Sequence, residues 1–143
     1  MKKVEAVIFD WAGTTVDFGS FAPTQIFVDA FKRAYDFDIT LAESRGPMGM
    51  GKIDHIRTLL NDPTIKARWA AQFGKDPSEK EVKEIYDTFM PLQIEAVVNF
   101  AEPLDGVLEV VDGLKANGVK IGSCSGYPTP VMTALVPAAE GYG

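Results

Sequence analysis

The stretch Val7-Ile8-Phe9-Asp10-Trp11-Ala12-Gly13-Thr14-Thr15 decides how the rest of the sequence is interpreted. Its apolar residues form a short continuous run that ends at the carboxylate of Asp10, and a small, hydroxyl-rich loop follows. Such a run is typical of a buried strand that is covered on both faces, as in a parallel sheet. Because parallel sheets carry their chemistry at the carboxyl ends of their strands, the pattern places Asp10 at a functional edge.

The composition is that of an ordinary globular domain and excludes several classes of protein. The chain has 143 residues, of which 46% are hydrophobic, so it can bury a sizeable core. A formal net charge of -6 and scattered Lys and Arg residues argue against binding to nucleic acid or to an anionic membrane. No apolar run has the length of a signal peptide or a membrane span, so the cytoplasm is the expected location.

The single cysteine, Cys124, excludes an internal disulfide and a multi-cysteine metal cluster. No residue that could activate its thiol is visible nearby in the sequence. We therefore interpret Cys124 as a small, buried apolar side chain.

The segment from residue 22 to about residue 99 has the pattern of helices only, with apolar residues at three- and four-residue spacing. Thr40 with Glu43, and Ser78 with Glu81, have the spacing of a capping box, which marks the start of a helix. After residue 101 the pattern returns to α/β, with a helix, a strand over residues 119–123 and a last helix. That last helix is predicted to start with Thr129 as its cap and Pro130 as its first residue, and to be broken by Pro137.

The sequence thus predicts an α/β fold with an inserted helical segment. Residues 1–20 form the first segment of a core domain, residues 21–100 a helical cap domain, and residues 101–143 the second segment of the core. Two short strands are too few for a doubly wound sheet, which has at least three or four. We therefore expect the chain to be a fragment or a truncated form of a longer protein.

The loop around Asp10 resembles the first motif of the haloacid dehalogenase superfamily, in which an aspartate nucleophile ends the first strand and Gly-Thr follows. The resemblance implies a Rossmannoid core of that type, here incomplete with two core strands, and an inserted α-helical cap. Most phosphatases of the superfamily have a second aspartate two residues later as general acid/base, where this sequence has Ala12. Because a poor alkoxide leaving group needs a proton donor, Ala12 disfavours ordinary phosphate-ester hydrolysis.

Three segments together resemble the phosphonoacetaldehyde hydrolase (phosphonatase) family: the Asp10 loop, Arg45–His55 and Gly122–Tyr127. The resemblance extends over nearly all of the chain. It implies that Lys52, in the cap, forms a Schiff base with the substrate aldehyde and that Asp10 attacks phosphorus. A protonated imine accepts the electrons of the C–P bond, so the carbon leaves as a neutral enamine. This chemistry needs no proton donor at Ala12, and its products are acetaldehyde and phosphate.

The same resemblance implies further members of the site. His55 handles protons during imine formation, although a surface position on a helix is the alternative. Residues expected to bind the phosphonate substrate are Thr14, Met48, Ser125, Gly126 and Tyr127. Magnesium is the expected cofactor, held by the Asp10 carboxylate, the Ala12 carbonyl and an aspartate of a later motif. Nothing in these 143 residues matches that later motif, so the chain alone is expected to be inactive or severely impaired.

Other interpretations stay open beside this one. Within the superfamily the chain could be a phosphatase or a dehalogenase, and outside enzymes it could be a non-catalytic helical interaction fragment. The exposed cap is compatible with a homodimer. Gly46, Gly51 and Lys52 have the spacing of the phosphate-binding loop of nucleotide hydrolases, but Ile53 stands where that loop needs Ser or Thr.

Overall fold

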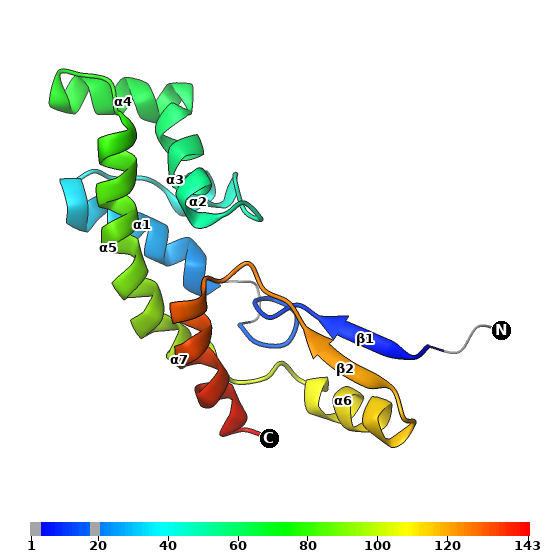
Figure 1. Ribbon diagram of the computed structural model, residues 1–143. Helices are drawn as coiled ribbons and strands as arrows, with labels where there is room; N and C mark the ends of the chain where they lie inside the picture. The colour runs from blue at the N-terminus through cyan, green and yellow to red at the C-terminus, as the bar shows by residue number, and fades with distance from the viewer. Residues whose placement is uncertain (1–3, 18–20) are drawn as a thin grey trace. The chain divides into compact units, whose positions relative to one another are not determined.

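The computed structural model describes residues 4–17 and 21–143, and the chain divides into two compact units (Figure 1). One unit comprises Met1–Phe21 and Ala96–Gly143, and we call it the sheet unit. The other is the continuous segment Ala22–Glu95, which we call the cap unit.

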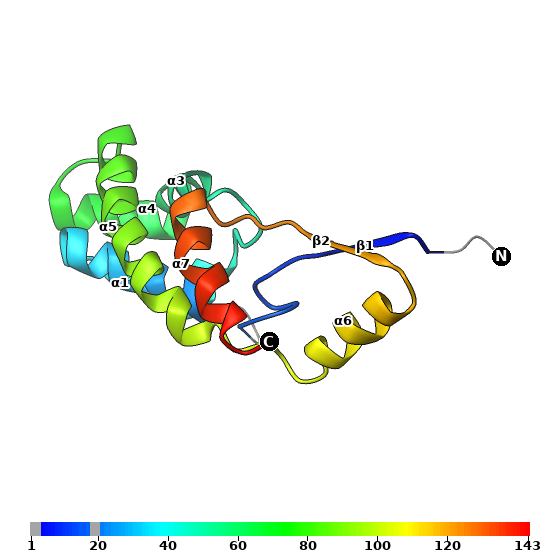
Figure 2. The ribbon, with the colours of Figure 1, turned by 60° about the horizontal axis from the view of Figure 1, so that its bottom comes forward.

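The sheet unit contains two parallel strands, β1 (Ala6–Phe9) and β2 (Lys120–Ser123). The register pairs Ala6 with Lys120, Val7 with Ile121, Ile8 with Gly122 and Phe9 with Ser123. Helix α6 (Val107–Ala116) lies along β2 in both ribbon views, and the short η1 (Val98–Phe100) contacts α7 (Thr129–Glu140) (Figures 1 and 2). A two-stranded parallel sheet joined by a helix confirms the predicted α/β class with two core strands.

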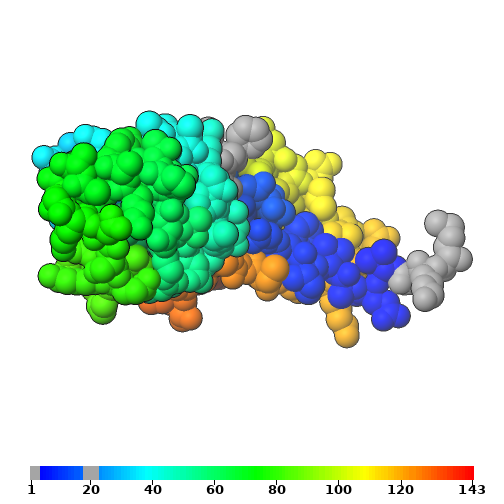
Figure 3. All heavy atoms as spheres, turned by 90° about the horizontal axis from the view of Figure 1, so that it is seen from above, coloured from blue at the N-terminus to red at the C-terminus, as the bar shows by residue number. Residues whose placement is uncertain are grey.

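The prediction that β1 is covered on both faces is wrong. Ile8 is 63% exposed and Val4, just before the strand, is 59% exposed, while Val7 and Phe9 are half-buried. In the space-filling view the residues of β1 (blue) lie at the surface (Figure 3). The reason is that the described residues provide β1 with one neighbouring strand, and α6 contacts that neighbour, β2.

The cap unit is helical throughout, as the spacing of apolar residues predicts. Its helices are α1 (Phe21–Tyr35), α2 (Leu41–Arg45), α3 (Lys52–Asn61), α4 (Pro63–Phe73) and α5 (Glu79–Val97), the first and last of which extend past the boundaries of the unit. Among the described residues, no helix combines the length and the apolar character needed to cross a membrane.

Side-chain caps fix the starts of three of these helices. The Thr40 hydroxyl accepts a hydrogen bond from the Glu43 amide at 3.1 Å, and Glu43 Oε2 accepts one from the Thr40 amide at 2.7 Å, which completes the predicted capping box. Glu81 Oε2 accepts likewise from the Ser78 amide at 2.8 Å. At α4, Asp62 accepts from two backbone amides, and Pro63 follows at the first helical position.

An aromatic cluster fills the interior of the cap unit around Trp69, whose side chain is fully buried. The centroid of Trp69 lies 4.9 Å from that of Tyr35, 5.0 Å from that of Phe37 and 4.5 Å from that of Phe73. Burying a large aromatic side chain stabilises a fold by about 1.5–3 kcal/mol, and such ring pairs add to this. The cap unit therefore has a hydrophobic core of its own.

The final helix differs from its prediction at two points. Helix α7 begins at Thr129, with Pro128 rather than Thr129 in the cap position, and Pro130 occupies the second helical position. Pro137 lies inside the helix, which continues to Glu140 instead of breaking. A proline removes one backbone hydrogen bond, and here fewer than four helical residues follow it, so little of the helix depends on the lost bond.

Candidate active site

The loop after β1 holds Asp10 at the exposed carboxyl end of the strand. Asp10 Oδ1 accepts a hydrogen bond from the Trp11 amide at 2.8 Å, and the Thr15 hydroxyl donates to the Asp10 carbonyl at 3.1 Å. The Trp11 carbonyl accepts from the amides of Thr14 and Thr15 at 3.0 and 2.8 Å. Gly13 has φ of 80°, a left-handed conformation that glycine adopts without strain. The result is a tight turn that presents the carboxylate to solvent.

The loop after β2 starts at the same edge of the sheet. The strands are parallel and Phe9 pairs with Ser123, so the residues that follow both strands leave the sheet together. The Cys124 amide donates to the Phe9 carbonyl at 2.9 Å, and Ser125 Oγ accepts from the Tyr127 amide at 3.0 Å. The structure thus brings the loops of Asp10 and of Ser125 to one edge within the sheet unit.

Cys124 is exposed, and its interpretation as a buried apolar side chain is wrong. It stands just past the last residue of β2, where the chain leaves the sheet and enters the loop that leads to α7.

The pKa of Tyr127, at this edge of the sheet, is affected by its burial and by nearby carboxylates, among them Asp17. Burial raises the pKa of Tyr127, and the negative charges of Asp17 and Asp10 act in the same direction. The phenol therefore stays protonated at neutral pH and remains a hydrogen-bond donor. Sequence reasoning gave Asp17 no role, although it is 5% exposed and has φ of 56°. Only its position in the first motif, close to Asp10 in the sequence, could have suggested a role for Asp17. The sequence pattern reveals neither the burial of its side chain nor its backbone conformation.

The described residues provide only part of the set of ligands that a magnesium ion needs. The Asp10 carboxylate and the Ala12 carbonyl are oxygen donors of the kind that Mg²⁺ prefers. Among residues 4–17 and 21–143, however, no three His, Cys, Asp or Glu side chains are grouped so that they could hold a metal ion. The described residues alone therefore do not make a complete magnesium site.

In the cap unit, Lys52 is the first residue of α3 and is half-buried. Its Nζ lies 5.8 Å from the centroid of the Phe27 ring. Burial lowers the pKa of Lys52 because an apolar environment disfavours the ammonium form. The positive end of the helix dipole acts in the same direction. At a given pH, the fraction of neutral, nucleophilic amine is therefore larger for Lys52 than for an exposed lysine.

His55 lies one turn further along α3 and is fully buried, which excludes the surface position considered from the sequence. Its Nε2 is 2.7 Å from the carbonyl oxygen of Ser44, and its ring stacks on Phe27 with centroids 3.8 Å apart. In the neutral ring, Nε2 must carry the hydrogen to donate to this carbonyl, so Nδ1 keeps its lone pair, and it has no hydrogen-bond partner.

The pKa of His55 is lowered to about 4, chiefly by burial. The hydrogen bond to the Ser44 carbonyl opposes this shift, and the charge of Lys52 adds to it. The imidazole is therefore neutral at neutral pH, Nδ1 is a buried acceptor, and the ring as a whole interacts electrostatically with Lys52.

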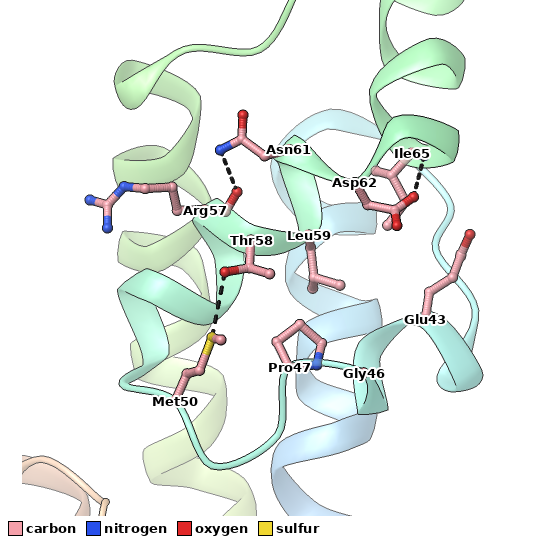
Figure 4. A pocket seen from close by; sticks show the side chains of 10 residues that line it. All are labelled: Glu43, Gly46, Pro47, Met50, Arg57, Thr58, Leu59, Asn61, Asp62 and Ile65. Carbon is pink, nitrogen blue, oxygen red and sulfur yellow. Dashed lines mark hydrogen bonds between the residues drawn. The ribbon is translucent and has the colours of Figure 1, made fainter.

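A pocket of about 570 Å³ lies in the cap unit beside the loop that precedes Lys52 (Figure 4). Met50 contributes to its lining, and its Sδ accepts a hydrogen bond from the Thr58 hydroxyl at 3.5 Å. Neither Lys52 nor Met48, which is 36% exposed, is among the lining residues. The pocket is thus separate from the amine. The loop also follows helix α2 rather than a strand, which excludes the phosphate-binding loop of nucleotide hydrolases.

Comparison with known proteins gives one family over almost the whole chain. The model of the haloacid dehalogenase-like hydrolases matches residues 4–142. The phosphonoacetaldehyde hydrolase of Aeromonas hydrophila is 64% identical over 140 residues, which are 98% of this chain and 50% of that protein. The phosphonoacetaldehyde hydrolase of Salmonella typhimurium is 59% identical over 143 residues, which are all of this chain and 53% of that protein.

A solved structure agrees with these sequences. The crystal structure of a phosphonoacetaldehyde hydrolase-like protein from Oleispira antarctica superposes with a TM-score of 0.92 at 41% identity. The match covers 98% of this chain and 50% of that one. The chain therefore spans about half the length of the relatives it matches.

Proposed function

The chain belongs to the haloacid dehalogenase-like hydrolase family, and from that premise we propose that its residues serve hydrolysis of the C–P bond of phosphonoacetaldehyde. The names of relatives at 59–64% identity support this substrate. The observation that carries the proposal is the environment of Lys52, a half-buried amine whose pKa burial lowers, next to a neutral histidine. An ordinary phosphatase has no use for a reactive amine, whereas cleavage of a C–P bond beside an aldehyde does.

The proposed first step uses the two residues of α3. The neutral form of Lys52 Nζ, which burial favours, attacks the aldehyde carbon of the substrate, and His55 Nδ1 relays the proton that the attacking nitrogen loses to the carbinolamine oxygen. Loss of water from the carbinolamine, with uptake of one proton from solvent, gives a protonated imine. The support for this role of His55 is its uncommitted, buried Nδ1 and its electrostatic interaction with Lys52.

The second step uses the edge of the sheet unit. The Asp10 carboxylate attacks phosphorus, the electrons of the C–P bond move into the imine, and the carbon leaves as an enamine. Protonation and hydrolysis of the enamine release acetaldehyde and Lys52, and water hydrolyses the aspartyl phosphate to phosphate. Groups proposed to hold the phosphoryl oxygens are the backbone at Thr14 and Gly126, the Ser125 hydroxyl and the Tyr127 phenol.

Magnesium is part of the proposal as the ion that neutralises charge at the phosphoryl group. The described residues offer it the Asp10 carboxylate and the Ala12 carbonyl, which are too few. We therefore expect the 143-residue chain to release little phosphate by itself. A turnover near that of the Aeromonas hydrophila relative would contradict this expectation.

Reductive trapping tests the amine role directly on this chain. Phosphonoacetaldehyde and sodium borohydride are added, and peptide mass mapping locates the reduced adduct. We expect it at Lys52 in wild type and in the matched control Lys66→Arg, and no adduct at this position in Lys52→Arg. An adduct spread evenly over the exposed lysines would refute the Schiff-base proposal and favour a phosphatase or a dehalogenase.

The alternative of a non-catalytic interaction fragment has its own measurement. Native mass spectrometry gives the oligomeric state, including the homodimer, and a magnesium titration shows whether the ion binds at all. A stable assembly with no trapping at Lys52 would favour that alternative.

A further inference from the structure

The side chain of Phe27 contacts both residues of the proposed amine site. Its ring stacks on His55 with an interplanar angle of 20°, and Lys52 Nζ stands 5.8 Å from its centroid. Phe27 is fully buried and is itself packed against Phe89, with centroids 4.4 Å apart. The ring therefore has a fixed position between α5 and the first turn of α3.

Backbone contacts hold this ring and His55 to the same framework. The Ser44 hydroxyl donates to the carbonyls of Leu41 and Thr24 at 2.9 and 3.3 Å, which ties α2 to α1 one turn before Phe27. The Ser44 carbonyl in turn accepts from His55 Nε2 at 2.7 Å. Helices α1, α2 and α3 are thus joined around Phe27, and all of these residues belong to the cap unit.

We propose that Phe27 is a positioning residue for Lys52: its ring supports His55 through stacking and forms an apolar surface beside the amine. The inference rests on the proposed role of Lys52 and adds a residue that does not itself react. In this arrangement the ring keeps water away from one side of Nζ, and the stack with His55 keeps the first turn of α3 in place.

Two effects of the ring on the amine oppose each other. The face of an aromatic ring attracts a cation, which favours the ammonium form, by about 0.5–1 kcal/mol at an exposed site. Exclusion of water favours the neutral amine. At 5.8 Å the cation lies near the outer limit of such contacts, of about 6 Å, so exclusion of water is the larger effect.

The experiment compares Phe27→Leu with Phe31→Leu in the complete 143-residue chain. Both phenylalanines lie on α1 and are fully buried, and both substitutions remove the same atoms. The ring of Phe31 contacts that of Phe37, with centroids 6.3 Å apart, and this contact involves neither Lys52 nor His55. Thermal unfolding followed by circular dichroism establishes that each variant folds. The readout is the pH titration of the Lys52 Cε resonance by NMR, assigned from its loss in Lys52→Arg.

We expect Phe27→Leu to raise the pKa of Lys52 by about half a unit or more, because water enters beside the amine. Phe31→Leu should leave it at the wild-type value. If both variants shift the titration equally, or Phe27→Leu does not shift it, the proposal is overturned. If Phe27→Leu fails to fold, Phe27→Met keeps most of the volume, and a shift of the same sign but smaller size is expected.

This titration is independent of the aldehyde experiment. Failure of Lys52 to form a reducible adduct in wild type would refute the proposed function, whereas the NMR titration would still measure what Phe27 does to the amine. His55 does not disturb the titration, because its lowered pKa keeps it neutral throughout the range in which lysine titrates.

Discussion

The cap unit and the sheet unit bury their apolar side chains to very different degrees, although they are similar in length. Among the described residues, fourteen of the nineteen buried apolar side chains belong to the cap unit. The sheet unit instead exposes several large apolar side chains, such as Ile8 at 63% and Val110 at 53%. The comparison teaches that the amine of Lys52 sits in a unit with a closed core, whereas Asp10 sits in one with an open apolar surface.

The largest expected effect concerns the core of the cap unit. Trp69→Ala should lower the free energy of unfolding by about 3–5 kcal/mol, since it removes a fully buried indole from an aromatic cluster. Ile8→Ala in the sheet unit should cost less than about 1 kcal/mol, because most of that side chain already contacts solvent. Urea unfolding followed by circular dichroism measures both. Equal losses of stability would contradict the difference in apolar burial between the two units.

The acid sensitivity of the cap unit is the next effect in size. The ammonium of Lys75, the hydroxyl of Ser78 and its amide hold the pKa of Glu81 at about 2. This folded value lies below the unfolded one of about 4.3. The contribution of the ionised Glu81 carboxylate to the free energy of unfolding is therefore complete above about pH 5, and it is lost as the pH falls through about 4 towards 2.

Glu81→Gln should accordingly lower the free energy of unfolding by about 1 kcal/mol at pH 7. The difference from wild type should shrink at about pH 3. Glu95→Gln, an exposed position on the same helix, serves as the control and should show no such change. A difference for Glu81→Gln that is the same at both pH values would exclude the carboxylate as its source.

A gain of stability is expected at Gln93. Its side chain is fully buried, and neither atom of its amide has a hydrogen-bond partner. Gln93→Met keeps the shape and removes the unpaired groups, so the free energy of unfolding should rise by about 1 kcal/mol. Gln25→Met, at an exposed position, should give no gain. A loss at Gln93 instead would show that ordered water or another group satisfies the amide, and thermal unfolding distinguishes the two results.

The smallest effect is expected on the open face of the sheet. A Cβ at Gly122 would lie 2.7 Å from Ile8 Cδ1, which is too close for two fixed atoms. Because Ile8 is exposed, its side chain can turn into solvent, and Gly122→Ala should change stability by less than about 0.5 kcal/mol. A loss greater than about 1 kcal/mol, measured by urea unfolding, would mean that this face is packed in solution.

Local patterns predict the helices and their starts well, since a capping box such as Thr40 with Glu43 needs only residues that are close in the sequence. The α/β class and the two strands follow from local periodicity in the same way. The exposure of Ile8 and Cys124 could not be predicted, because an apolar run does not reveal how many layers cover it. Burial depends on neighbours distant in sequence.

The same limit applies to the candidate site. The resemblance of motifs points to Lys52 and His55, but not to the ring of Phe27 or the carbonyl of Ser44 against which His55 rests. Phe27 and Ser44 belong to helices α1 and α2, whereas the two motif residues belong to α3. Phe27 and Ser44 contact His55 only because the three helices pack together. The periodicity within each helix does not predict how the helices are aligned with one another.

The cap unit is one uninterrupted stretch of chain, Ala22–Glu95, whereas the sheet unit is assembled from two separate stretches. In genetic terms, a single inserted segment suffices to introduce Lys52, His55 and Phe27 together. Recombination at the two junctions exchanges that set as one block and leaves the codon for Asp10 untouched. The residues proposed to act at carbon and the residue proposed to act at phosphorus can thus be inherited independently of each other.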